Sequence, residues 1–295
     1  MIINLNYLDK IYRGGRLANI QTFCNHSYTL CNLIGIKCDD RIKADAQWTV
    51  DTTIQSGDNT SDGFAVIALG ELLKTPIIFK IMDDSWRSKK EKRVHKVFRM
   101  YPHRNIVQSI CEFSCRDDTI RWLKKIQAPQ ILCSPEGKSK FTIILQEFIE
   151  GGDLTNIEFW TLPMWKSVTL QLMFTSIELF DRLGFIYEDW NLRNILADTT
   201  EEKVLQYKAY GKTWTITDSC GISPVFTDFS RSDMLLDKKE DWHLAVQLSH
   251  CMDTMKNSCP DRHIKKTVKD YSIKVEMLED IDSILDCVGE FIDQL

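Results

Sequence analysis

Three oxygen-bearing side chains in the second half of the chain have the types and spacing of a site for a divalent cation. Asp189 and Asn194 lie five residues apart in FIYEDWNLRNIL, and Asp228 follows the apolar run ISPVF after one threonine. Carboxylate and amide oxygens suit Mg²⁺, which takes one or two protein ligands together with phosphate oxygens of a substrate. Each residue alone is more often part of a turn or a helix cap, so the prediction depends on their joint occurrence.

A lysine inside a predicted strand indicates a second charged group. Lys80 lies in the apolar run PIIFKIM. An ammonium group there must reach solvent or meet an anion, because burying it unpaired is very costly. In the helix predicted to follow, Glu91 shares an apolar face with Val94 and Phe98. This inward position predicts a Lys80–Glu91 ion pair, while two unrelated surface charges remain the alternative.

A polar loop with two glycines lies between two predicted strands. The stretch SGDNTSDG carries Gly57 and Gly63, and glycine-bearing turns let backbone N–H groups approach phosphate. A phosphate-binding loop and an ordinary hairpin loop explain this stretch equally well.

The composition is that of a globular protein. The chain has 295 residues, of which 43% are hydrophobic and 27% charged, with a net charge of −5. This length allows one large or two small domains. The negative charge argues against a broad nucleic-acid surface, and no apolar stretch approaches the length of a membrane span. We therefore expect neither a membrane nor nucleic acid as a main partner.

The cysteines predict a reducing compartment, either cytoplasmic or nuclear. The chain has ten cysteines and shows no secretory signal pattern, so we expect reduced thiols. Cys24, Cys31 and Cys38 recur every seven residues with His26 nearby, which raises the alternative of a zinc site. Cysteines on a helix face or in the core explain the spacing better, because no CxxC pair is present.

Strands are predicted mainly before residue 150 and helices mainly after it. This segregation predicts an α+β fold with a mainly β lobe and a mainly α lobe. We expect an N-terminal extension over 1–46 that packs on the N-lobe, an N-lobe over 47–150 and a C-lobe over 151–295. The predicted elements are strands within 47–82, a helix over 85–100, strands over 105–113 and 141–149, a helix over 165–183 ended by Gly184, short strands over 185–228, and helices from 240 onward.

The order and spacing of these residues resemble the eukaryotic-type protein kinase fold over roughly residues 47–250. IIFKI resembles the VAIK strand of that family, YEDWNLRNIL resembles HRDLKxxNIL, and TDFS stands where the family has DFG. The resemblance implies a bilobal protein-kinase-like fold with a small β-rich N-lobe and a larger helical C-lobe. It also implies ATP and Mg²⁺ as cofactors.

The same resemblance assigns roles to the residues singled out above. Lys80 would contact the α- and β-phosphates, with Glu91 as its partner. Asp189 would be the catalytic base, acting with Lys80 and Asn194. Asn194 and Asp228 would be the magnesium ligands.

The stretch LQEFIEGGDL resembles the hinge of that family. Gln146 then takes the gatekeeper position, and Glu147 and Ile149 would offer backbone groups to adenine. Asp153 lies where an acid that binds ribose is common.

The stretch LQYKAYGKTWTITDSCGISPVFTDFSRS resembles haspin and the kinase-like proteins of large DNA viruses. Both carry a tyrosine, a GKT-type hairpin and a closing D-F-x-x-S. The compact, divergent chain is closest in style to the viral group, which adds a host cell or a virion to the expected locations.

Several residues depart from the kinase pattern. Tyr187 replaces the histidine of HRD and Glu188 replaces its arginine. Asn191, which is also among the expected nucleotide-binding residues, replaces the lysine that steadies the γ-phosphate. Only twelve residues separate Asp228 from Asp241, and no APE motif is present. The usual peptide-docking platform is therefore expected to be missing or rebuilt.

Three functions follow from this pattern. The first is phosphoryl transfer from ATP to a serine or threonine hydroxyl of a protein, with Asp189 as the base. The second is a nucleotide-binding pseudokinase or scaffold that acts through protein partners. The third is a small-molecule phosphotransferase. The sequence identifies neither the protein substrate nor the oligomeric state.

Overall fold

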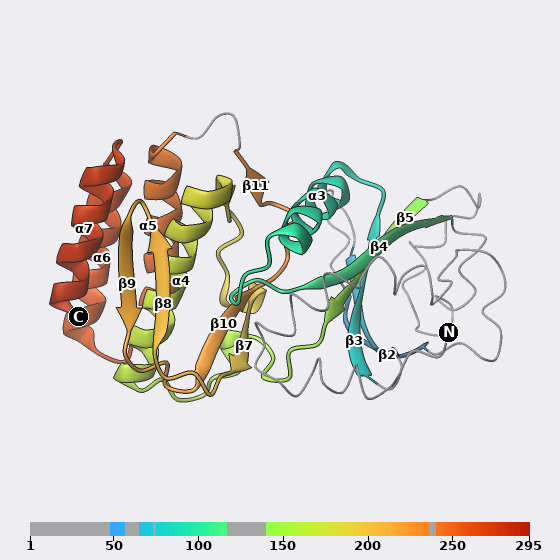
Figure 1. Cartoon of the computed structure of the whole chain (residues 1–295). Helices are drawn as coiled ribbons and strands as arrows, with labels where there is room; N and C mark the ends of the chain where they lie inside the picture. The colour runs from blue at the N-terminus through green and yellow to red at the C-terminus, as the bar shows by residue number, and fades with distance from the viewer. Residues whose placement is uncertain (1–47, 57–64, 73–74, 117–139, 236–239) are drawn as a thin grey trace. The chain divides into compact units, whose positions relative to one another are not determined.

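The computed structural model of the chain (Figure 1) describes residues 48–56, 65–72, 75–116, 140–235 and 240–295. Three predictions lie outside these residues: the extension over 1–46, the loop with Gly57 and Gly63, and the cysteine-rich stretch near His26. The chain divides into two compact units, unit 1 (Met1–Phe148) and unit 2 (Ile149–Leu295). The sequence places this boundary two residues later, between 150 and 151.

The fold class is α+β, as predicted. The described residues form five α-helices and small antiparallel sheets. No described helix combines the length and the apolar character needed to cross a membrane. Cys220, Cys251, Cys259 and Cys287 are free thiols.

Unit 1 contains a five-stranded antiparallel sheet with the order β1-β2-β3-β5-β4. Its central strand is buried on both faces: Phe79 and Ile81 are inaccessible on one side, and Lys80 and Met82 are buried on the other. The register sets Lys80 between Ile67 of β2 and Ile144 of β5. The strands are β1 (Trp48–Ser56), β2 (Ala65–Leu72), β3 (Thr75–Asp83), β4 (Ser109–Arg116) and β5 (Lys140–Glu147).

Helix α3 (Trp86–Met100) follows β3, as the periodicity predicts. Ser85 caps its N-terminus by accepting a hydrogen bond from the backbone N–H of Ser88 (3.3 Å). Buried residues recur every three or four positions, and they include Glu91. Near its C-terminal end, Arg99 forms an ion pair with Glu112 of β4. These contacts place the buried face of α3 on the sheet.

Unit 2 is mainly helical. The long helix α4 (Leu162–Leu183) is buried along most of its length, and the indole of Trp165 donates a hydrogen bond to the carbonyl of Met255 in α5 (2.9 Å). Three two-stranded antiparallel sheets lie between α4 and α5 in the chain. They are formed by β6 (Phe185–Ile186) with β11 (Asp233–Met234), β7 (Ile195–Thr199) with β10 (Ile222–Phe226), and β8 (Leu205–Ala209) with β9 (Lys212–Ile216); the remaining helices are α5 (Trp242–Lys256), α6 (Arg262–Glu276) and α7 (Ile281–Gln294).

Gly184 ends α4 in a left-handed conformation (φ 60°, ψ 29°), and its amide donates to the carbonyl of Phe180 (2.9 Å). A Cβ at this position would lie 2.9 Å from the carbonyl carbon and oxygen of Leu235. We therefore expect Gly184→Ala to lower the free energy of unfolding by at least about 1–2 kcal/mol, the usual cost of a left-handed residue with a side chain. Urea denaturation measures this change.

Gly289 provides the matched control within α7. A Cβ there meets no atom within 4 Å, so Gly289→Ala should raise the free energy of unfolding by about 0.5–1 kcal/mol through the better helix propensity of alanine. Equal effects of the two substitutions would contradict the assignment of Gly184 as an obligatory left-handed cap.

Candidate active site

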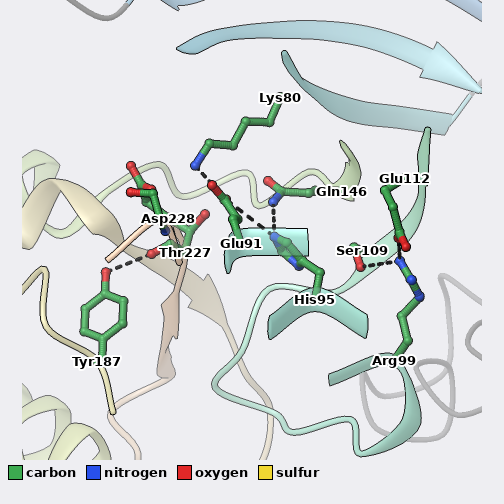
Figure 2. A network of polar contacts seen from close by, with 11 residues as sticks. Lys80, Glu91, His95, Arg99, Ser109, Glu112, Gln146, Tyr187, Thr227 and Asp228 are labelled. Carbon is green, nitrogen blue, oxygen red and sulfur yellow. Dashed lines mark hydrogen bonds and ion pairs between the residues drawn. The ribbon is translucent and has the colours of Figure 1, made fainter. Parts of the chain in front are cut away.

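The first chemical feature is a buried ion pair in unit 1. The ammonium nitrogen of Lys80 lies 2.7 Å from Oε1 of Glu91, and both side chains are almost wholly inaccessible to solvent (Figure 2). Strand β3 supplies the lysine, and the inward face of α3 supplies the carboxylate. The structure thus has the pair that the sequence spacing predicts. Removing both charges from water costs free energy that their attraction often does not offset. The stability of the fold therefore does not explain why this pair is present.

Two neutral groups extend this pair. His95, one helical turn after Glu91, places Nε2 3.6 Å from Glu91 Oε1 and 2.9 Å from the amide nitrogen of Gln146. Burial lowers the pKa of His95, and the adjacent Glu91 opposes this shift only in part. The imidazole is therefore neutral near pH 7. His95 is not among the residues predicted for the site, although its spacing of four residues from Glu91 places it on the same helix face.

The lowered pKa of His95 predicts a pH dependence of stability. The unfolded chain binds a proton at this histidine below about pH 6.5, whereas the folded chain resists it. The free energy of unfolding should therefore fall as the pH drops from about 6.5 toward the folded-state pKa, with a slope of up to about 1.4 kcal/mol per pH unit. His95→Gln removes this component, so urea denaturation between pH 5 and 8 should give a flatter profile for the variant.

The exposed His250 provides the control for this experiment. His250→Gln should keep the steep profile of the wild-type chain. If the His95→Gln profile runs parallel to that of the wild-type chain, the neutral, buried state of His95 is wrong.

The second chemical feature is a pair of loops in unit 2 that strands β7 and β10 hold together. The register pairs Ile195 with Phe226, so the residues just outside the ladder, Asn194 and Thr227, are neighbours. The amide of Thr227 donates to the carbonyl of Asn194 (3.0 Å). The side-chain amide of Asn194 donates in turn to the carbonyl of Asp189 (3.3 Å). The structure therefore brings together Asp189, Asn194 and Thr227, the residue before Asp228. Asp189, Asn194, Thr227 and Asp228 are here called the loop cluster.

Tyr187 donates hydrogen bonds to two backbone carbonyls of the loop cluster. Its hydroxyl lies 2.8 Å from the carbonyl of Thr227 and 3.2 Å from the carbonyl of Asn194, and its side chain is buried (Figure 2). Its backbone N–H donates to the side chain of Gln247 in α5 (3.0 Å). The sequence analysis recorded Tyr187 only as a substitution, because its contacts depend on the pairing of distant strands.

Asp228 has a left-handed backbone conformation (φ 55°), which aspartate tolerates better than most residues with a side chain. Its carboxylate accepts a hydrogen bond from the backbone N–H of Ser230 (3.4 Å). The next residue, Phe229, is fully buried and packs edge-on against the rings of Phe185 and Tyr187. The buried ring anchors the turn that carries the Asp228 carboxylate.

The loop cluster fits a magnesium ion in its donor chemistry. The hydrogen bond from the amide nitrogen of Asn194 to Asp189 leaves the amide oxygen to act as a ligand, and the Asp228 side chain is partly exposed. Two protein oxygens are what Mg²⁺ commonly takes when phosphates and water complete its shell. Across the described ranges, no three or more histidine, cysteine, aspartate or glutamate side chains are grouped to hold a metal ion by themselves.

Asp153 and Asn191, both expected at the nucleotide, act here as caps of short 3₁₀ helices. Asp153 accepts from the amide of Thr155 (2.9 Å), and Asn191 accepts from the amide of Arg193 (3.0 Å). Asp153 also forms an isolated bridge with Leu196, two residues after the asparagine of the loop cluster. Asp153 therefore lies beside the strand that carries the loop cluster.

Glu147 and Ile149, the expected adenine-binding residues, have backbone partners of their own. The backbone N–H of Glu147 donates to the carbonyl of Gln108 (3.0 Å), and the carboxylate of Glu147 accepts from the backbone N–H of Gln108 (2.8 Å). The carbonyl of Ile149 accepts from the amide of Gly152 (3.4 Å). The N–H of Glu147 is thus already used within unit 1.

Asp241, the residue resembling the αF aspartate of kinases, has a contact away from the loop cluster. Its carboxylate accepts a hydrogen bond from the backbone N–H of Ile281 (3.2 Å), at the start of α7. Asp241 therefore joins the N-terminal ends of α5 and α7.

Arg231, which the sequence analysis did not single out, lies next to the loop cluster. Its Nη1 is 3.7 Å from Oδ1 of Asp189. No motif signals this contact in the sequence, because it arises from the pairing of two strands that are each two residues long.

No model of a known protein family matches the chain, and no curated protein matches it either.

Proposed function

We propose that the protein is a magnesium-dependent protein kinase with the two-lobed, haspin-like fold that the sequence resemblance implies. It transfers the terminal phosphoryl group of ATP to a serine or threonine hydroxyl of a protein. The observation that carries the proposal is the loop cluster, in which hydrogen bonds join Asp189, Asn194 and Thr227, the residue before Asp228. These bonds support a site in which the Asp189 carboxylate would accept a proton and the oxygens of Asn194 and Asp228 would bind a divalent cation.

The reaction assigns a separate task to each residue. The acceptor hydroxyl oxygen forms a bond to the terminal phosphorus of ATP, the bond from that phosphorus to the bridging oxygen breaks, and ADP leaves with the bond electrons. The hydroxyl proton passes to the carboxylate of Asp189. Asn194 and Asp228 would hold the magnesium ion, which neutralises charge on the phosphate oxygens. Lys80, oriented by Glu91, contacts the α- and β-phosphates in this proposal.

A second candidate, a nucleotide-binding pseudokinase, is favoured by one observation. Asn191 is neutral, and its side-chain oxygen is occupied by the amide of Arg193. It therefore supplies no positive charge close to Asp189, and phosphoryl transfer depends chiefly on positioning and charge stabilisation. Such a protein would bind ATP without turning it over.

Two measurements on the full chain separate these candidates. Transfer of labelled phosphate from ATP with Mg²⁺ is followed on a panel of proteins, peptides and small alcohols, and includes autophosphorylation. Thermal denaturation is followed with and without ATP–Mg²⁺, because a ligand that binds the folded state raises the midpoint. Transfer to protein supports the kinase, and stabilisation without any transfer supports the pseudokinase. Transfer to small alcohols alone would assign a small-molecule phosphotransferase.

A further inference from the structure

Arg231 owes its position to the smallest sheet of unit 2. Strand β11 pairs with β6 in the register Asp233 to Ile186 and Met234 to Phe185. Following this antiparallel register outward by two residues brings Arg231 opposite Glu188, the residue before Asp189. The turn from Phe229 to Ser232 is closed by a backbone hydrogen bond of 3.1 Å. The short return of the chain to β6 thus places a guanidinium at the loop cluster.

The ion pair of Arg231 with Asp189 leaves most N–H groups of the guanidinium to bind another anion. The Nη1 atom lies 3.7 Å from Asp189 Oδ1, which is an ion pair at longer range than a hydrogen bond. A guanidinium carries five N–H donors in a planar fork suited to phosphate oxygens. The side chain of Arg231 is about half exposed, so ligands from solvent can reach it.

Stability does not account for this arrangement. Ion pairs between exposed side chains contribute little to folding, and the Asp189 carboxylate is itself one-quarter exposed. A half-exposed cation next to a catalytic base has a direct use in phosphoryl transfer, where negative charge is spread over the oxygens of the moving group. Asn191, two residues after Asp189, is neutral and therefore cannot stabilise that negative charge as a cation would.

We propose that Arg231 binds the oxygens of the phosphoryl group while it is transferred to the acceptor beside Asp189. The inference rests on the proposed kinase function and names the cation of that site. In the step, phosphorus gains a bond to the acceptor oxygen and loses its bond to the bridging oxygen of ATP. The acceptor proton goes to Asp189, and the guanidinium of Arg231 stabilises the equatorial oxygens.

The test compares Arg231→Met with Arg193→Met in the full chain. Arg193 is an exposed arginine of the same loop region, and its backbone N–H donates a hydrogen bond to the side chain of Asn191. We expect Arg231→Met to lower kcat about 100-fold, the usual loss when one donor to a developing oxyanion is removed, with little change in KM for ATP. Arg231→Lys should retain part of the activity, and Arg193→Met should match the wild-type chain.

A double variant distinguishes direct contact of Arg231 with phosphate from positioning of Asp189. Asn191→Lys in the Arg231→Met background places an ammonium group two residues from the base, and we expect it to recover at least part of the lost kcat. Recovery supports direct charge stabilisation, whereas no recovery assigns Arg231 to holding Asp189 and overturns the phosphate contact. Thermal denaturation of each variant identifies any loss of kcat that comes from unfolding. If Arg231→Met does not fold, the kcat of Arg231→Lys decides whether Arg231 has this role.

The outcomes separate the inference from the proposed function. Transfer that depends on Asp189 but is unchanged in Arg231→Met overturns the role of Arg231 and leaves the kinase proposal standing. A wild-type chain that transfers no phosphate to any acceptor rejects both.

Discussion

Replacing Asp189 by asparagine should lower kcat for phosphate transfer by about 10²–10⁴-fold, the contribution typical of a positioned general base. An amide cannot accept the proton of the acceptor hydroxyl. The fold should survive, because the side chain of Asn194 bonds to the backbone carbonyl of Asp189, which the substitution keeps. Initial rates with labelled ATP measure the effect, and urea denaturation should give a free energy of unfolding close to that of the wild-type chain.

Glu188 is the control for this substitution. It is an exposed acid in the adjacent position, so Glu188→Gln removes the same charge from the same loop without touching the proposed base. We expect kcat to stay within a small factor of the wild-type value. If Asp189→Asn and Glu188→Gln have equal kcat values, Asp189 is not the base.

Removing one partner of the buried pair should have the largest effect on stability. Glu91→Leu leaves the ammonium group of Lys80 buried without its carboxylate, and breaking such a pair typically costs about 3–5 kcal/mol. Both side chains are at most 3% exposed and the two charged atoms are 2.7 Å apart, so water cannot replace the lost partner. Urea denaturation followed by circular dichroism measures the change.

The double variant Lys80→Met/Glu91→Leu is the matched comparison. Replacing a buried ion pair by apolar groups of similar size is often neutral, or stabilising by about 1–4 kcal/mol. We therefore expect the double variant to be at least as stable as the wild-type chain, yet to lose phosphate transfer. This combination would show that the pair is retained for a task other than folding. A double variant as unstable as Glu91→Leu would instead make the pair a structural requirement.

The features that local patterns control could be predicted from the sequence. The apolar spacing on α3 placed Glu91 inward, and the alternation of β3 put Lys80 in a strand that is buried on both sides. The end of α4 at Gly184 also followed from the residue type. Each of these predictions uses residues within a few positions of one another.

The features that depend on distant pairing could not be predicted in the same way. The approach of Asn194 to Thr227 is fixed by the β7–β10 register, whereas the local pattern predicts only that short strands are present. Tyr187 and Arg231 are placed by contacts with segments about 40 residues away in the chain. A strand of two residues such as β11 carries no periodicity, so its partner was unpredictable.

Residue type also left the use of some polar side chains undecided. Asp153 and Asn191 were expected at a nucleotide, and each accepts a backbone hydrogen bond as a cap. A capping residue can still contact a ligand, in which case its side chain would serve two purposes. Their roles at the nucleotide stay predictions.

The buried ring of Phe229 restricts the turn that carries Asp228. Its ring is fully enclosed between Phe185 and Tyr187, and β11 pairs with β6 four residues after it. Rotating Asp228 away from the loop cluster would expose an aromatic side chain and break that small sheet. We therefore expect the turn that carries Asp228 to keep a single conformation.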